Sequence, residues 1–167
     1  MEGFVNKVQE SGLITLDLTQ FYPAEPIVLF DIKPLLFMEL ILKEKEFRAA
    51  LTTIDWTQYQ NNIVGIYCST DAIIPMWANM LVASFLQPFA TAVYFGNEEQ
   101  VRAQILSESI AKIDTSSYND QRVVVKGCGE IPVGEAAYVA ITQKLRPVVK
   151  SIMYGEPCST VPVYKKK

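Results

Sequence analysis

Short apolar runs alternate with amphipathic stretches along most of this chain. Four runs have the length and the aliphatic and aromatic content of buried strands: Ile63–Tyr67, Ala92–Phe95, Val123–Lys126 and Ser151–Tyr154. An amphipathic stretch follows Pro75 and another follows Pro132, and Glu98–Ile113 carries apolar residues at helical spacing with charges on its other face. This alternation predicts an α/β fold with a mostly parallel sheet flanked by helices, because short strand-helix-strand crossovers join parallel strands.

The pattern contains an internal repeat with a spacing of 59 positions (113 − 54 = 59). The repeated residues are Ile54, Asp55, Tyr59, Leu86, Pro88 and Gly96, which recur as Ile113, Asp114, Tyr118, Leu145, Pro147 and Gly155. We therefore predict two β-α-β units, residues 54–97 and 113–156, in a single α/β domain over residues 1–167. The two repeated aspartates precede strands, so we expect them to cap backbone amides.

The N-terminal extension, residues 1–53, has no partner in this repeat. Leu13–Leu18 and Ile27–Ile32 are predicted to be added strands, and Glu44–Thr53 a helix. The uncharged stretch Ala72–Asn97 is long enough to raise the question of a membrane span, but prolines and polar residues interrupt it. A buried helix followed by a buried strand is the better account.

Composition and charge exclude several classes of function. The net charge of −3 and the pI near 5.0 give no electrostatic footprint for nucleic acid. No export signal is visible, and three cysteines, an odd number, indicate reduced thiols in a cytoplasmic protein. The chain has no histidine, so catalysis would need carboxylates, thiols, lysine, tyrosine or a cofactor.

The cysteines are the strongest candidates for a site. Cys68 and Cys128 each follow an apolar run, 60 positions apart, and Cys158 follows the last run of the second copy. Since carboxyl ends of parallel strands meet at one edge, all three are expected to gather at one edge of a single sheet. Thiolates select zinc or an iron–sulfur cluster, and three of them leave one position open for water or a carboxylate, with Asp71, Glu130 and Glu156 nearest.

Three classes of function stay open on these residues. The leading hypothesis is a metal- or iron–sulfur-cluster-binding protein that acts in cluster assembly or metal handling. The second is a lyase- or hydrolase-type enzyme that uses the same cluster or zinc as a Lewis acid. The third is a structural or interaction module with inert buried cysteines, because cysteine also serves as a small buried hydrophobe. Whether copies of the chain associate with one another is also left open.

Four segments resemble an uncharacterised bacterial family classed only as a domain of unknown function. They are Phe30-Asp31-Ile32-Lys33, Ile41-Leu42-Lys43-Glu44-Lys45-Glu46-Phe47-Arg48, Lys126-Gly127-Cys128 and Gly155-Glu156-Pro157-Cys158-Ser159-Thr160-Val161-Pro162. The resemblance covers nearly the whole chain. It implies a link to genes of the sulfur-mobilisation machinery, with iron–sulfur assembly proteins as partners and a cluster rather than zinc. It assigns no catalytic residues.

Overall fold

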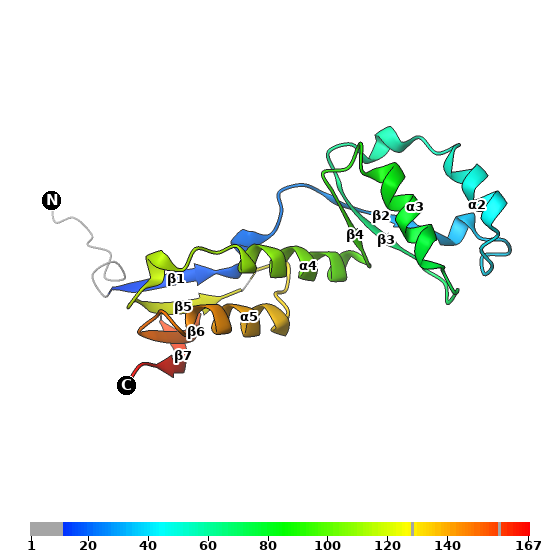
Figure 1. Ribbon diagram of the computed structural model, residues 1–167. Coiled ribbons are helices and arrows are strands. Elements are labelled where there is room, and N and C mark those ends of the chain that lie inside the picture. Colours follow the sequence, from blue (N-terminus) through cyan, green and yellow to red (C-terminus); the bar gives the residue numbers. More distant parts are fainter. Residues whose placement is uncertain (1–11, 128, 157) are drawn as a thin grey trace. The chain divides into compact units, whose positions relative to one another are not determined.

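The computed structural model describes residues 12–127, 129–156 and 158–167, and it divides into two compact units (Figure 1). Unit 1 combines the two ends of the chain, up to Tyr22 and from Ile105 to Lys167, and unit 2 is Pro23–Gln104. Unit 2 is thus inserted between the first strand of unit 1 and the rest of that unit.

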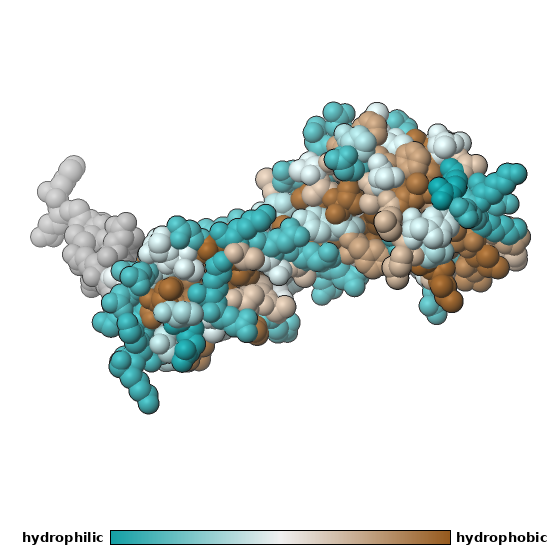
Figure 2. Space-filling view, viewed as in Figure 1, coloured by the Kyte–Doolittle hydropathy of each residue, from teal (hydrophilic) through white to brown (hydrophobic). Residues whose placement is uncertain are grey.

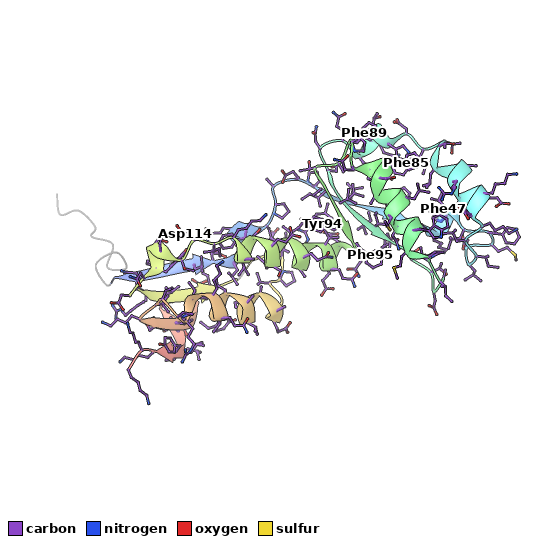
Figure 3. The ribbon with its side chains drawn as sticks, viewed as in Figure 1. Phe47, Phe85, Phe89, Tyr94, Phe95 and Asp114 are labelled. Atoms are coloured by element: carbon purple, nitrogen blue, oxygen red, sulfur yellow. The ribbon has the colours of Figure 1, made fainter. Side chains whose placement is uncertain are left out.

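Unit 2 is built on a parallel sheet of three strands in the order β2-β3-β4. The strands are β2 (Ile27–Asp31), β3 (Ile63–Tyr67) and β4 (Ala92–Phe95). The helices are α2 (Glu44–Leu51) and α3 (Met76–Leu86). Figure 3 shows Phe47 on α2, Phe85 in the last turn of α3 and Phe89 just beyond its C-terminal end. Apolar residues of β3 and α3 share one buried cluster, so α3 covers one face of the sheet.

Aromatic packing organises the core of unit 2. Trp56 stacks on Phe30 and on Phe85, with ring centroids 5.4 and 5.1 Å apart, and its indole nitrogen donates to the Leu51 carbonyl at 3.0 Å. The Phe47 ring meets Trp77 edge to face at 6.1 Å. These contacts join the sheet, α2 and α3 into one core.

Unit 1 has a sheet of four strands in the order β1-β5-β6-β7. β1 (Leu13–Asp17), β5 (Arg122–Lys126) and β6 (Ser151–Glu156) are parallel, and β7 (Ser159–Lys165) turns back antiparallel to β6. Helix α5 (Glu135–Leu145) joins β5 to β6, and its residues share a buried cluster with these strands. The connecting helix α4 (Glu98–Ala111) starts within unit 2 and ends within unit 1.

The strands and helices predicted from sequence are present, and the mixed α/β class is confirmed. The prediction of a single sheet is wrong, because each of the two repeats builds its own sheet. The N-terminal strands explain the difference: β2 pairs with β3 of the first copy, and β1 pairs with β5 of the second. In a two-stranded β-α-β unit the first strand pairs on one side only and leaves its other edge open. Each copy covers that edge with its own additional strand.

The strands and helices of the two copies begin at positions that keep the 59-residue spacing. β3 and β5 start 59 positions apart (122 − 63 = 59), as do α3 and α5 (135 − 76 = 59). The repeated glycines Gly96 and Gly155 both have positive φ, 132° and 114°, which glycine adopts at little cost. Gly96 directly follows β4, whereas Gly155 lies within β6, so the repeat preserves the backbone conformation at this position although the second strand continues past it.

The repeated aspartates cap backbone amides as predicted. Asp55 Oδ1 accepts from the Thr57 amide at 3.1 Å, and Asp114 Oδ1 accepts from the Ser116 amide at 2.9 Å. The stretch Ala72–Asn97 contains the predicted helix and strand, α3 followed by β4, but only one face of α3 is buried and β4 is partly exposed. In the part of the chain that the structure describes, no helix is long and apolar enough to cross a membrane.

Candidate functional site

Three charged side chains meet at the carboxyl edge of the unit 1 sheet. Asp17, Lys126 and Glu156 are the last residues of β1, β5 and β6. The Lys126 ammonium lies 3.8 Å from Asp17 Oδ2 and 3.5 Å from Glu156 Oε1. The side chains are partly exposed, so these ion pairs contribute less than about 1 kcal/mol each to stability. They do fix one positive charge between two carboxylates at this edge.

Local hydrogen bonds hold Asp17 in place. Its Oδ1 accepts from the Thr19 amide at 3.0 Å and from the Thr19 hydroxyl at 2.7 Å. Burial raises the pKa of Asp17, but the Thr19 hydrogen bonds and the charge of Lys126 outweigh it, so the pKa lies below its ordinary value. Asp17 is therefore a carboxylate over the physiological pH range.

A hydrogen-bonded aspartate also ends a strand at the carboxyl edge of unit 2. Asp31, the last residue of β2, accepts from the Ser69 amide at 3.0 Å, the Ser69 hydroxyl at 2.5 Å and the Lys33 amide at 3.0 Å. Burial raises the pKa of Asp31, yet these hydrogen bonds and the charge of Lys33 bring it below the ordinary value. Asp31 thereby fixes the loop that leaves β3, which carries Cys68 and Asp71.

The two aspartates reveal a repeat that the sequence analysis missed. Leu16-Asp17-Leu18 and Phe30-Asp31-Ile32 match at a spacing of 14 positions (31 − 17 = 14). In both segments the residues that flank the aspartate are buried and the aspartate ends a strand. The apolar-Asp-apolar pattern was visible in the sequence, but its short spacing differs from the 59-residue repeat and hid it.

The structure separates the predicted cysteines into different environments. Cys68 belongs to unit 2, is half-buried and packs against the apolar core. Cys158 belongs to unit 1 and is exposed, one residue before β7. Cys128 lies outside the described residues, and Asp71 is exposed in the same loop as Cys68. Within the described residues, no group of three or more cysteine, aspartate or glutamate side chains is arranged to hold a metal ion.

The register of the strands shows that Cys68 and Cys128, 60 positions apart, do not occupy equivalent places in the 59-residue repeat. β3 ends at Tyr67 and β5 ends at Lys126, so Cys68 corresponds to Gly127, and Ser69 corresponds to Cys128. A Cβ at Gly127 would collide with the Tyr138 hydroxyl and lie 2.9 Å from Val133 Cγ2. In the second copy, Tyr138 therefore occupies the space into which a side chain at position 127 would extend.

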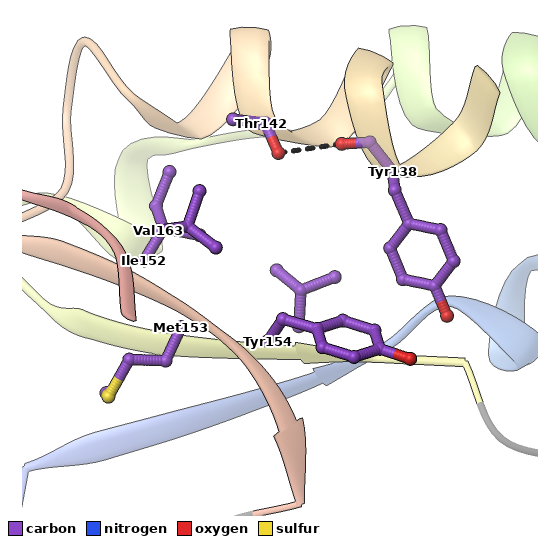
Figure 4. Close-up of a pocket in the computed structure, with 7 residues that line it drawn as sticks. Tyr138, Thr142, Ile152, Met153, Tyr154 and Val163 are labelled. Carbon is purple, nitrogen blue, oxygen red and sulfur yellow. Dashed lines mark hydrogen bonds between the residues drawn. The ribbon is translucent and has the colours of Figure 1, made fainter. Parts of the chain in front are cut away.

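A cavity of about 230 Å³ lies between α5, β6 and β7 of unit 1 (Figure 4). Its walls are apolar and aromatic, and the Tyr138 and Tyr154 rings meet edge to face at 5.5 Å. The Thr142 hydroxyl donates to the Tyr138 carbonyl at 2.7 Å. No cysteine, carboxylate, lysine or arginine is among its lining residues, so its described walls offer no acid, base or nucleophile beyond hydroxyl groups.

Comparison with known proteins identifies a family without assigning an activity. No curated protein matches the chain, and no solved structure matches it. The model of one family, described as a protein of unknown function, matches residues 2–166. That match extends over both units and over the charged residues at their carboxyl edges, and the chain therefore belongs to the DUF2480 family.

Proposed function

We propose that this chain binds a metal ion or an iron–sulfur cluster through the thiols of unit 1, and that it acts in metal handling or cluster assembly. The proposed donors are Cys128 and Cys158. Asp17 and Glu156 are candidate carboxylate ligands at the same edge. The proposal narrows the three-cysteine site by leaving out Cys68.

The observation that carries the proposal is the parallel pairing of β5 with β6. Cys128 follows the end of β5 by two positions, and Cys158 follows the end of β6 by two positions. Adjacent parallel strands deliver the segments that follow them to one edge of a sheet, where α/β proteins commonly bind ligands. This topology supports two thiols at one edge.

The chemistry of the edge favours a soft cation with open coordination positions. Thiolates are soft ligands that select zinc and iron–sulfur clusters, and carboxylates complete zinc sites. Two thiolates alone do not close a tetrahedral site, and open positions suit a protein that passes a metal or cluster to another protein. The Lys126 ammonium, held near Asp17 and Glu156, would offset part of the negative charge of a thiolate-bound centre.

A second candidate, an interaction module with inert thiols, is favoured by the environment of Cys68. That side chain packs with the apolar residues of unit 2 and takes part in no group of metal ligands among the described residues. On this interpretation Cys68 contributes only packing, as buried free cysteines commonly do, and the thiols have no ligand.

Elemental analysis of anaerobically purified protein separates the two candidates. Iron, zinc and acid-labile sulfide are measured in the parent chain, in the Cys128→Ser/Cys158→Ser variant and in the matched Cys68→Ser control. The proposal expects metal in the parent and in Cys68→Ser and its loss from the double variant. A cluster also gives brown protein with broad absorbance near roughly 400 nm, the iron–thiolate charge-transfer region.

Each other outcome decides against part of the proposal. Metal absent from all three proteins under strict exclusion of oxygen favours the interaction module. Metal lost from Cys68→Ser, with the fold preserved by circular dichroism, refutes the restriction of the site to unit 1. Metal retained by the double variant refutes a thiolate site on these two cysteines.

A further inference from the structure

Unit 2 presents a group of exposed apolar side chains at one edge. We call it the apolar edge patch, and it consists of Phe37, Met38, Leu40, Ile41, Ile73, Met76 and Met80. Ile73 is 93% exposed, Met76 80% and Met38 75%. Single exposed apolar residues are ordinary on protein surfaces, but a concentration of large ones marks an interaction site.

Topology brings the two segments of the patch together. Residues 37–41 follow β2, and Ile73, Met76 and Met80 lie in the loop and helix that follow β3. β2 and β3 are adjacent and parallel, so both segments leave the same edge of the sheet (Figure 1). Figure 2 shows hydrophobic surface at this end of the unit.

Helix α2 connects the two segments. The Lys43 ammonium lies over the Phe37 ring, 3.5 Å from its centroid, at the start of α2. In the last turn of α2, the Arg48 guanidinium lies 5.0 Å from the Trp77 ring centroid, beside Met76 in the sequence. Helix α2 therefore contacts both segments, one at each of its ends.

The turn that carries four of the seven patch residues is preformed. The Phe37 amide donates to the Ile41 carbonyl at 2.8 Å, and the Ile41 amide donates to the Phe37 carbonyl at 3.0 Å. Met38 and Glu39 both have positive φ, 52° and 60°, which costs free energy for residues other than glycine. Such a turn holds apolar side chains outward and loses little entropy when a partner binds.

The area of the patch matches what a dimer needs. With a fully exposed large apolar side chain presenting about 150–200 Å², the seven residues present on the order of 800 Å². Each partner in a protein interface of standard size buries about 800 Å². The largest apolar patch on a typical monomer is roughly 300–600 Å².

Charges around the patch favour a second copy of this chain over a partner whose surface carries charge of one sign only. Lys33 pairs with Glu39 at 3.2 Å, and Arg48 pairs with Glu44 at 2.9 Å. The rim thus carries charges of both signs, two ion pairs and the Lys43 ammonium over the Phe37 ring, and two identical rims can meet without large repulsion. We propose that the apolar edge patch is the interface of a symmetric dimer of this chain. This inference is independent of the thiols.

Sedimentation velocity on the full chain tests the dimer. The Met76→Glu/Met80→Glu variant places charges on exposed helical positions, and Val139→Glu is the matched control on α5, where Val139 is 58% exposed. At about 10 µM, parent and control are expected to sediment as dimers, whereas the double variant should dimerise at least ~100-fold more weakly.

A parent chain that is monomeric at that concentration overturns the proposal and leaves the patch to a different protein or a lipid surface. A double variant that dimerises as tightly as the parent also overturns it. If circular dichroism shows that the double variant is unfolded, Met38→Asp on the preformed turn decides by the same criterion: its dimer must also weaken at least ~100-fold.

Discussion

Replacing Gly65 by alanine tests how tightly the central strand of unit 2 is packed. Gly65 lies in the middle of β3, between the buried residues Val64 and Ile66. An added Cβ would lie 2.7 Å from the Gly96 carbonyl oxygen, 2.8 Å from Val101 Cγ2 and 3.0 Å from Leu29 Cδ2. The Gly96 oxygen belongs to the backbone, and the Gly96 amide donates to the Ile66 carbonyl at 2.8 Å. Relieving the overlap with the new Cβ therefore requires the backbone that follows β4 to move.

The expected loss is about 2 kcal/mol in the free energy of unfolding. Overpacking a well-packed core costs about 1–3 kcal/mol, and contact with backbone places this site at the upper end. Alanine also restricts the unfolded chain relative to glycine, which returns about 0.4–1 kcal/mol.

Urea unfolding followed by tryptophan fluorescence measures this loss, because both tryptophans, Trp56 and Trp77, lie in unit 2. The midpoint should fall by roughly 1 M relative to the parent. Gly134→Ala is the control, since an added Cβ there meets no atom within 4 Å; because Gly134 lies in unit 1, its unfolding is followed by circular dichroism. A midpoint shift below about 0.2 M for Gly65→Ala would refute the packing argument.

Two further predictions concern the strand ends. Ser69→Ala should lower stability by about 1 kcal/mol at pH 7, because Asp31 loses a hydrogen bond to its charged form. The folded pKa of Asp31 is depressed, so this contribution is fully present above the unfolded value of about 3.9 and disappears as the pH falls through the folded pKa. Urea midpoints of variant and parent should therefore converge in acid, and a constant difference would contradict the role of Asp31. Gly127→Ala should destabilise unit 1 by roughly 1–2 kcal/mol through its collision with the Tyr138 hydroxyl. Thermal unfolding by circular dichroism should show this cost reduced by at least half in a Tyr138→Phe background, and an unchanged cost would assign it to Val133 instead.

Local patterns alone predicted much of the fold. The apolar runs located β3 and β4 with the bounds that the structure has, and the 59-residue spacing predicted two β-α-β units. The caps at Asp55 and Asp114 also followed from the sequence. These features depend on side-chain period, chain stiffness and hydrogen bonds within a few residues, which a single sequence contains.

Strand pairing required the tertiary structure, because it joins segments far apart in the chain. β1 pairs with β5 across more than 100 positions, whereas β2 pairs with β3, and no local signal distinguishes these partners. That pairing turned one expected sheet into two and assigned Cys68 and Cys158 to different units. In the 59-residue repeat Gly65 corresponds to Val124, which is buried. The sequence permits a side chain at this repeat position, and only the packing of Leu29, Gly96 and Val101 around β3 excludes one from the first copy.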